Sequence, residues 1–252
     1  IWQTQSETYA RPTRDELASV IRRAIAGRAS SDTAVGICVP GRRDPSGKVL
    51  LLSVNLPALN GLRIDELVQA SMDDPPARIE ICSDSTANAY DIYAIHQLRG
   101  RLLSLAIGTG IGAAVLDDGV LLRVDGESPG HVGQFDCSIA GDDVVGPDGG
   151  AGSLEGYFSA PALVRRYGPD MATNLQRLSE ADAPLRALAR AIRICHAMFC
   201  PDHIALTGGL GNRMSHLLAI IRRLVEKDLT SIAKKDWTLL TGSDDFHAAK
   251  GA

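Results

Sequence analysis

The sequence predicts an α/β protein with two lobes. Apolar segments with strand character alternate with amphipathic helical segments along the chain, and the segment 105–115 consists of a strand, a glycine turn and a second strand. The chain has 252 residues, of which 45% are hydrophobic, and this is enough for two cores. We expect an N-terminal lobe over 1–105 and a C-terminal lobe over 106–245.

The first lobe begins with a helix. Thr13 and Glu16 form a capping box, the following apolar residues fall on one helical stripe, and Gly27 is where the helix is expected to end. Further elements follow in order: strands at 34–39 and 49–54, a helix near 64–71, a strand at 77–82 and a helix after residue 84.

The second lobe begins with a strand meander over 102–122, in which Asp118-Gly119 is predicted to form a hairpin turn. After Leu154 the pattern is mainly helical. The remaining expected elements are helices at 161–167, 184–199 and 214–229, strands at 203–207 and 237–240, and a last helical turn at 246–252.

The glycine turn at 108–112 has the composition of a phosphate-binding loop. Gly108, Gly110 and Gly112 lack the Cβ atoms that would keep an oxyanion from the backbone N–H groups, and Thr109 adds a hydroxyl donor. A plain β-hairpin explains the same glycines, so both interpretations stay open at this point.

Asp84 follows a strand and begins a helix. In open α/β sheets the ends of the strands face the ligand crevice, which favours a general base at this position. An aspartate here also serves as a helix N-cap, and the residue pattern alone leaves the two roles open.

Further motifs follow in chain order. They are Gly130-His131-Val132-Gly133-Gln134, then Ser153-Leu154-Glu155-Gly156, then Thr207-Gly208-Gly209. With Ser83-Asp84 and Gly108-Thr109-Gly110, these motifs resemble the sugar kinases of the ROK family, which belong to the actin-like ATPase and hexokinase superfamily. The resemblance runs from about residue 35 to residue 211 and implies the two-lobed actin-like ATPase (ribonuclease H-like) fold with a central cleft.

The resemblance assigns a role to each matching residue. Asp84 corresponds to the catalytic base, and Ser83 replaces the asparagine of the family's Asn-Asp pair. Gly108, Thr109 and Gly110 correspond to the second phosphate loop, and Gly208 and Gly209 to the adenosine-side motif. The sugar would be bound by Asn55, His131 and Glu155. A helical first turn explains Glu155 as well, and turn chemistry explains Asn55 and the Gly208 segment.

Two departures from the family pattern lie in the element 130–134 and in the cysteines. His131 stands where the family has a sugar-binding glutamate, and Gln134 stands where it has a zinc-ligating histidine. The family's Cys-x-Cys is absent and Ser153 replaces a third cysteine, whereas a structural zinc site needs four Cys or His ligands. The sequence therefore predicts no zinc and no other resident metal. His131 remains open between a sugar contact and a structural histidine.

A third departure lies at the start of the sequence. The family's first phosphate loop, Asp-x-Gly-x-Thr, is absent, and the chain begins Ile1-Trp2-Gln3. Either this is a piece of a longer protein or it is a degenerate relative, and we expect the former because loss of a central strand would leave unpaired edges. The last turn, 246–252, is expected to fold back onto the first lobe, as in the family.

Composition excludes several classes of protein. No apolar run approaches the length that spans a bilayer, and a net charge of −4 without a basic cluster makes nucleic acid an unexpected partner. Five cysteines without ligand spacing are expected to be buried free thiols of a reducing compartment. We therefore expect a cytoplasmic protein, and a homodimer is possible.

Together these features predict phosphorylation of a hexose hydroxyl, which the resemblance implies to be the 6-hydroxyl, by ATP with Mg²⁺. The alternative class is a ROK-type sugar-responsive transcriptional regulator or an inactive sugar-binding protein. A dehydrogenase fits less well, because the glycine turn leads into a strand rather than a helix.

Overall fold

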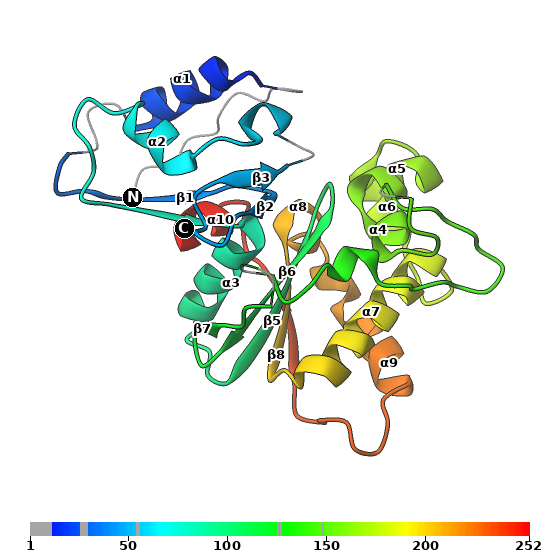
Figure 1. The fold of residues 1–252 in the computed structure, drawn as a ribbon. Coiled ribbons are helices and arrows are strands. Elements are labelled where there is room, and N and C mark those ends of the chain that lie inside the picture. Colours follow the sequence, from blue (N-terminus) through cyan, green and yellow to red (C-terminus); the bar gives the residue numbers. More distant parts are fainter. Residues whose placement is uncertain (1–11, 26–29, 54–55, 125, 127, 148) are drawn as a thin grey trace. The chain divides into compact units, whose positions relative to one another are not determined.

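The chain forms two compact units (Figure 1). The computed structural model describes residues 12–25, 30–53, 56–124, 126, 128–147 and 149–252. Unit 1 comprises Ile1–Ser83 with Ala252, and unit 2 comprises Asp84–Gly251. The boundary between lobes near residue 105 stays a prediction.

Unit 1 begins with α1 (Arg14–Ile25). The expected capping box is present: the Thr13 N–H donates to the Glu16 carboxylate at 2.7 Å, and the Glu16 N–H donates to the Thr13 hydroxyl at 3.3 Å. This reciprocal pair satisfies N–H groups that a helix start otherwise leaves without partners. Gly27, the expected end of the helix, lies outside the described residues.

The rest of unit 1 is built on two strand pairs. Strands β1 (Ala34–Cys38) and β4 (Arg78–Cys82) are parallel, while β2 (Arg42–Arg43) and β3 (Leu50–Leu52) are antiparallel. Strand β2 was not expected from the sequence, because two arginines carry no strand signal. A turn η1 (Pro57–Leu59) and helix α2 (Ile64–Gln69) complete the unit. Its core consists of Val39, Leu50, Leu59, Ile64, Leu67 and Val68.

Unit 2 is centred on a five-stranded sheet of order β7-β6-β5-β8-β9. Strand β5 pairs antiparallel with β6 and parallel with β8, and β8 pairs parallel with β9. Asp118 and Gly119 have φ of 45° and 81°, as the predicted hairpin turn requires. The strands are β5 (Arg101–Ile107), β6 (Ile111–Asp117), β7 (Val120–Leu121), β8 (His203–Thr207) and β9 (Thr238–Thr241).

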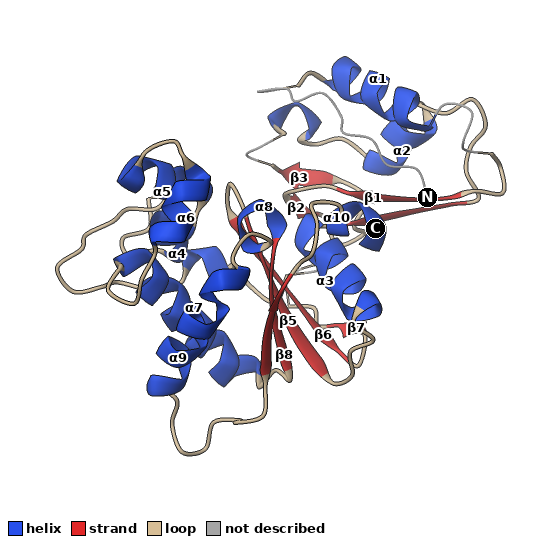
Figure 2. Ribbon diagram, turned by 180° about the vertical axis from the view of Figure 1, so that it is seen from behind, coloured by secondary structure: helices blue, strands red, loops and turns tan. Residues whose placement is uncertain are grey.

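Helices cover both faces of this sheet (Figures 1 and 2). Successive residues of a strand point to opposite faces, so Leu102 of β5 joins a small core with Ile92, and Leu103 joins the large core. The small core lies under α3 (Asp84–Ile95), on which α10 (His247–Gly251) packs. The large core lies under α7 (Ala183–Phe199) and α9 (Leu218–Lys227).

Short helices fill the remaining segments of unit 2. Hydroxyl side chains fix two of their starts, since the Gly156 N–H donates to Ser153 Oγ at 3.2 Å and the Ala162 N–H donates to Ser159 Oγ at 3.3 Å. These elements are η2 (Val132–Gln134), α4 (Leu154–Phe158), α5 (Ala160–Tyr167), α6 (Met171–Arg177), α8 (Gly208–Gly211) and η3 (Ser215–Leu217).

The cysteines are free thiols, as expected, but the expectation that all are buried is wrong. Cys137 and Cys195 are buried, whereas Cys200 is exposed. Cys200 ends α7 in the left-handed conformation, with φ of 47°, and this places it at the surface rather than in the core.

Alkylation of the native protein with iodoacetamide at pH 8 is expected to label Cys200 and to spare Cys137 and Cys195. Burial raises the pKa of each of these two thiols to about 12, so the reactive thiolate is nearly absent at pH 8. Peptide mass spectrometry after timed quenching measures the labelling. Equal labelling of all three in the folded protein would contradict the burial of the two thiols.

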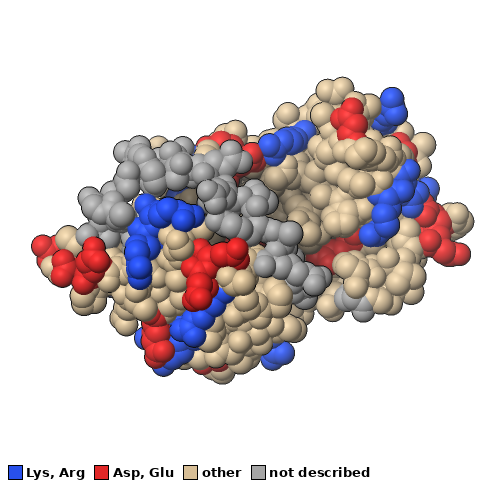
Figure 3. Space-filling view, turned by 90° about the horizontal axis from the view of Figure 1, so that it is seen from above, with Lys and Arg blue, Asp and Glu red and all other residues tan. Residues whose placement is uncertain are grey.

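Among the helices in the described part of the chain, none has the length and apolar character needed to cross a membrane. On the face that Figure 3 draws, Lys and Arg are interspersed with Asp and Glu rather than gathered into one field. This distribution matches the small net charge of −4.

Candidate functional site

The glycine turn between β5 and β6 closes tightly on itself. The Gly108 N–H donates to the Gly110 carbonyl at 2.9 Å, as in a hairpin. The N–H groups of Thr109 and Gly110 have no partner within the described part of the chain, and Thr109 is exposed. The segment is thus a hairpin that also presents two backbone donors, which is the arrangement that a bound oxyanion needs.

Residues of α4 and α5 form hydrogen bonds to both ends of this turn. The Ala160 N–H donates to the Gly108 carbonyl at 2.8 Å, and the Ile111 N–H donates to Glu155 Oε1 at 2.6 Å. Ile111 is only 7% exposed, so the carboxylate satisfies a donor that water reaches poorly. Glu155 therefore contacts the turn directly, a contact that the sequence did not predict.

The Glu155 carboxylate is packed between two glycines. A methyl group at Gly110 would stand 2.9 Å from Glu155 Oε1, and one at Gly133 would stand 2.6 Å from the same atom. Both positions therefore require glycine for the carboxylate to keep its place. Gly133 belongs to η2, so Glu155 joins the glycine turn to the loop that carries His131.

His131 precedes η2 and is exposed. Its carbonyl accepts the Gln134 N–H at 3.0 Å, which fixes the backbone of the loop. No contact of its imidazole is found within the described residues. His131 is therefore accessible on the loop whose Gly133 approaches Glu155, and its role in sugar binding stays a prediction.

Asp84 is the first residue of α3 and is exposed. Its Oδ1 accepts the N–H of Ser85 at 2.9 Å, and its carbonyl accepts from the Asn88 amide at 2.7 Å. In the described part of the chain its second carboxylate oxygen has no partner. One oxygen thus supports the helix start, while the other is available to accept a proton.

The start of α3 lies against the glycine turn. A methyl group at Gly112 would stand 3.0 Å from the Ser85 side chain, next to Asp84. Unit 2 therefore brings together three elements far apart in sequence: the start of α3, the turn after β5, and α4 with Glu155.

The segment after β8 approaches the end of β5. Gly208 has φ of 76°, and a methyl group there would stand 2.8 Å from the Ile107 carbonyl oxygen. Only glycine combines this conformation with such a close approach. Gly209 faces open space. Gly208 thus lies beside the end of β5, and the nucleotide-binding role of both glycines stays a prediction.

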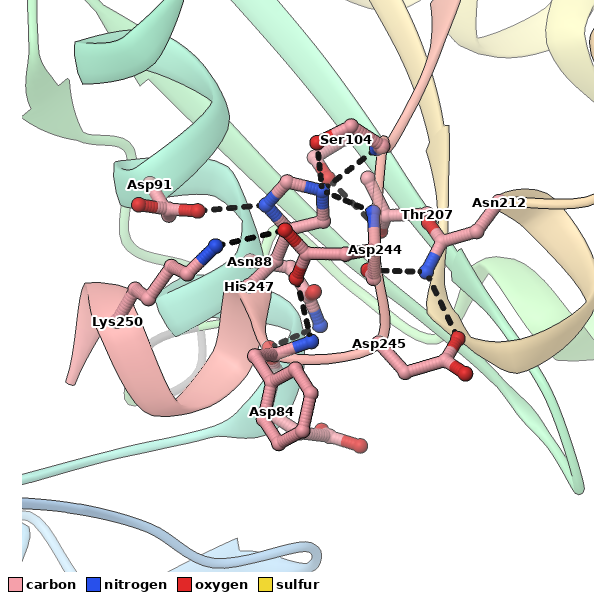
Figure 4. Close-up of polar contacts among 12 residues, drawn as sticks. Asp84, Asn88, Asp91, Ser104, Thr207, Asn212, Asp244, Asp245, His247 and Lys250 are labelled. Atoms are coloured by element: carbon pink, nitrogen blue, oxygen red, sulfur yellow. Dashed lines mark hydrogen bonds and ion pairs between the residues drawn. The ribbon is translucent and has the colours of Figure 1, made fainter. Parts of the chain in front are cut away.

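A buried polar contact ties the end of the chain to α3 (Figure 4). His247 Nδ1 lies 2.5 Å from Asp91 Oδ2, and these residues are 1% and 8% exposed. The Ser243 N–H donates to His247 Nε2 at 2.8 Å. Because Nε2 accepts, Nδ1 carries the proton and donates to Asp91, so the imidazole is neutral. Sequence reasoning missed this pair.

The same C-terminal loop contacts the segment after Gly208. The Asn212 amide donates to the Asp244 carbonyl at 2.6 Å, and Arg213 forms an ion pair with Asp245 at 2.8 Å. A sequence signal for Asp91 did exist. Asp91 lies seven residues after Asp84 on the same helix, and this spacing places both carboxylates near one face of α3.

Two expected sugar-site residues belong to the N-terminal part. Asn55 lies outside the described residues. Ser83 is half-buried between β4 and α3, directly before Asp84. The role of both residues in sugar binding stays a prediction.

The segment 134–153 does not fit a zinc ion. Gln134 is exposed, the Cys137 side chain is buried in the apolar core, and Ser153 caps α4. No group of three or more His, Cys, Asp or Glu side chains suited to a metal occurs among the described residues.

Direct contacts hold this segment instead. The Ile139 N–H donates to the Tyr157 hydroxyl at 3.0 Å, and that hydroxyl donates to the Asp142 carbonyl. Arg166 binds the Asp142 carboxylate with two bonds of 2.7 Å. Such paired contacts from a partly buried arginine are stronger than an ordinary surface pair.

The purified protein is expected to contain less than about a tenth of an equivalent of zinc, because the required thiolates and imidazole are missing. Elemental analysis measures the content, and a melt with and without EDTA should give the same midpoint. Stoichiometric zinc that survives dialysis would show that other residues form a site.

The chain matches a known protein family over nearly its whole length. The model of the family described as "ROK family" matches residues 2–252. No curated protein sequence matches the chain.

Solved structures resemble nearly the whole chain. A ROK family glucokinase from Streptomyces griseus, in complex with glucose and AMPPNP, has a TM-score of 0.73 at 20% identity, covering 96% of this chain and 88% of that one. A ROK hexokinase from Thermus thermophilus has a TM-score of 0.66 at 21% identity, covering 94% and 83%.

A ROK family transcriptional regulator, a homolog of the E. coli MLC protein, has a TM-score of 0.73 at 17% identity, covering 96% and 68%. These likenesses confirm the predicted α/β class and the actin-like ATPase fold of ROK proteins.

Proposed function

Because the chain belongs to the ROK family, we propose that it transfers the γ-phosphoryl group of ATP to a hydroxyl of a hexose. The observation that carries this proposal is the meeting of three groups in unit 2. They are the exposed Asp84 carboxylate, the N–H groups of Thr109 and Gly110, which have no partner among the described residues, and the Glu155 carboxylate. Phosphoryl transfer needs little besides positioning, a proton acceptor and donors for the phosphoryl oxygens.

Asp84 acts as general base. An alcohol is a weak nucleophile, and removal of its proton as the oxygen attacks phosphorus lowers the barrier. The oxygen of Asp84 that does not bind Ser85 accepts this proton, while the Ser85 contact fixes the orientation of the carboxylate.

The turn at Thr109 and Gly110 binds phosphoryl oxygens through its two free N–H groups and the Thr109 hydroxyl. Gly208, beside the end of β5, and Gly209 after it let the nucleotide approach the backbone. Mg²⁺, held mainly by nucleotide phosphates, supplies neutralisation of their charge when bound.

Glu155 and His131 bind hydroxyls of the sugar, with Asn55 and Ser83 as further members of the sugar site. The glucose in the similar Streptomyces griseus structure is consistent with a hexose. The 6-hydroxyl is the proposed acceptor.

The test is an assay of the purified protein with ATP, Mg²⁺ and a panel of hexoses and N-acetylhexosamines. Sugar phosphate is detected by mass spectrometry and ADP by a coupled assay. Sugar-dependent ADP release at least tenfold above release without sugar supports the proposal, and the absence of sugar phosphate with every sugar contradicts it.

A second candidate is a sugar-responsive regulator of the same family. The similar transcriptional regulator, with a TM-score equal to that of the glucokinase, favours it. Calorimetric sugar binding without phosphoryl transfer would select this alternative.

A further inference from the structure

A basic pocket lies between α7 and α9, and it contains none of the residues proposed to bind the sugar, the nucleotide or the transferred proton. It has a volume of about 120 Å³, roughly the space of four water molecules. The pocket is lined by Ile139, Arg186, Ala189, Arg190, Arg193, Leu224, Lys227 and Asp228. Four of these residues are cationic, and Asp228 is the acid among them.

The three arginines come from one face of α7. Residues 186, 190 and 193 follow the spacing that aligns side chains along a helix, and Lys227 adds its charge from the last turn of α9. Helices α7 and α9 lie side by side (Figures 1 and 2).

Most of this charge is not neutralised. Within the described part of the chain, Arg186, Arg193 and Lys227 form no ion pair, and Arg190 donates to the Ser138 carbonyl. Other arginines nearby are paired, since Arg222 binds Glu226 and Arg223 binds Glu180. Like charges at this spacing cost stability.

The pocket floor strengthens the field of these cations. Ile139 and Ala189 are 5% and 4% exposed, and Leu224 is partly buried. Buried apolar residues beneath a charged cleft raise its potential. Arginine forks match the geometry of phosphate oxygens, and a phosphate group fits the available volume.

We propose that this pocket binds the phosphate group of a small anion. The site is independent of the phosphoryl transfer proposed above. A second copy of this chain is a poor occupant, because a two-fold contact would place the same cations opposite one another.

The experiment follows the arginine side-chain Nε–H signals by NMR at constant ionic strength, with inorganic phosphate as the probe and chloride as the matched salt. Saturable shifts of Arg186, Arg190 and Arg193 are expected. The double variant Arg186→Gln, Arg193→Gln should weaken phosphate affinity at this pocket at least about tenfold, as measured on the amides of 189–190.

The matched control is Arg177→Gln, which removes the same charge from an exposed arginine on α6. Its phosphate affinity should stay within twofold of the parent. The single pocket variant Arg186→Gln is measured beside this control. If Arg177→Gln lost as much phosphate affinity as Arg186→Gln, binding would reflect net charge alone, and the proposal would be overturned. Absence of saturable shifts with phosphate would also overturn it.

Hexose 6-phosphate and ATP are then titrated in the same way. The ligand with the lowest Kd at 189–190 identifies the source of the phosphate group, and each of these outcomes supports the site. The amides of Thr109 and Gly110 report separately on the glycine turn, so failure of the basic pocket and failure of the proposed function are distinguishable.

Discussion

Asp84→Asn is expected to lower kcat by about 10²-fold to 10⁴-fold while unit 2 stays folded. The asparagine oxygen can still accept the Ser85 N–H that Asp84 Oδ1 now accepts at 2.9 Å, so the start of α3 is kept. What is lost is the proton acceptor. KM for sugar and for ATP should change only a few-fold, since positioning is retained.

Steady-state kinetics and a thermal melt measure the two effects. The matched control is Asp236→Asn, an exposed carboxylate of the same unit that has no partner in the described part of the chain. This control should leave kcat unchanged. Activity of Asp84→Asn within threefold of the parent would mean that another group takes the proton.

Glu155→Ala is expected to lower kcat/KM by about 10²-fold or more. It removes a proposed sugar contact and also leaves the poorly exposed Ile111 N–H without its acceptor, a loss of about 1 to 3 kcal/mol. KM for sugar should therefore rise because a sugar contact is lost, and KM for ATP should rise because the glycine turn is loosened.

Glu155→Gln separates these two effects. Its amide oxygen can still accept the Ile111 N–H, so KM for ATP should return close to that of the parent, while KM for sugar stays raised. Hydrogen exchange at Ile111 provides a second measurement, with faster exchange in the alanine variant alone. Equal KM for ATP in all three proteins would show that the turn does not depend on this carboxylate.

Local sequence patterns predicted strands, turns and helix starts well where the residues themselves strongly favour one conformation. The strand 203–207 has the predicted bounds, and Asp118-Gly119 forms the predicted turn because both residues tolerate positive φ. The helix start at Thr13 and Glu16 was readable for the same reason. The two-residue strand Arg42–Arg43 was not, since its pairing depends on β3 rather than on its own side chains.

The sequence predicted which residues belong to the candidate site, but it did not predict the contacts between them. The motifs named Asp84, Thr109 and Glu155, but the bond from Ile111 to Glu155 joins residues 44 positions apart. Periodicity carries no information on such pairs. The exposure of Cys200 was missed although the end of α7 at Phe199 was predicted, because helix bounds do not show that the next residue lies at the surface.

The contact between His247 and Asp91 can form only late in synthesis of the chain, because its two residues are far apart in the sequence. Asp91 leaves the ribosome 156 residues before His247, which takes about 8 to 30 s at roughly 5 to 20 residues per second. Throughout that interval α3, the helix that begins with Asp84, lacks the neutral imidazole that later satisfies its buried carboxylate. The proposed catalytic base would then be among the first parts of unit 2 to be made and among the last to be held in place.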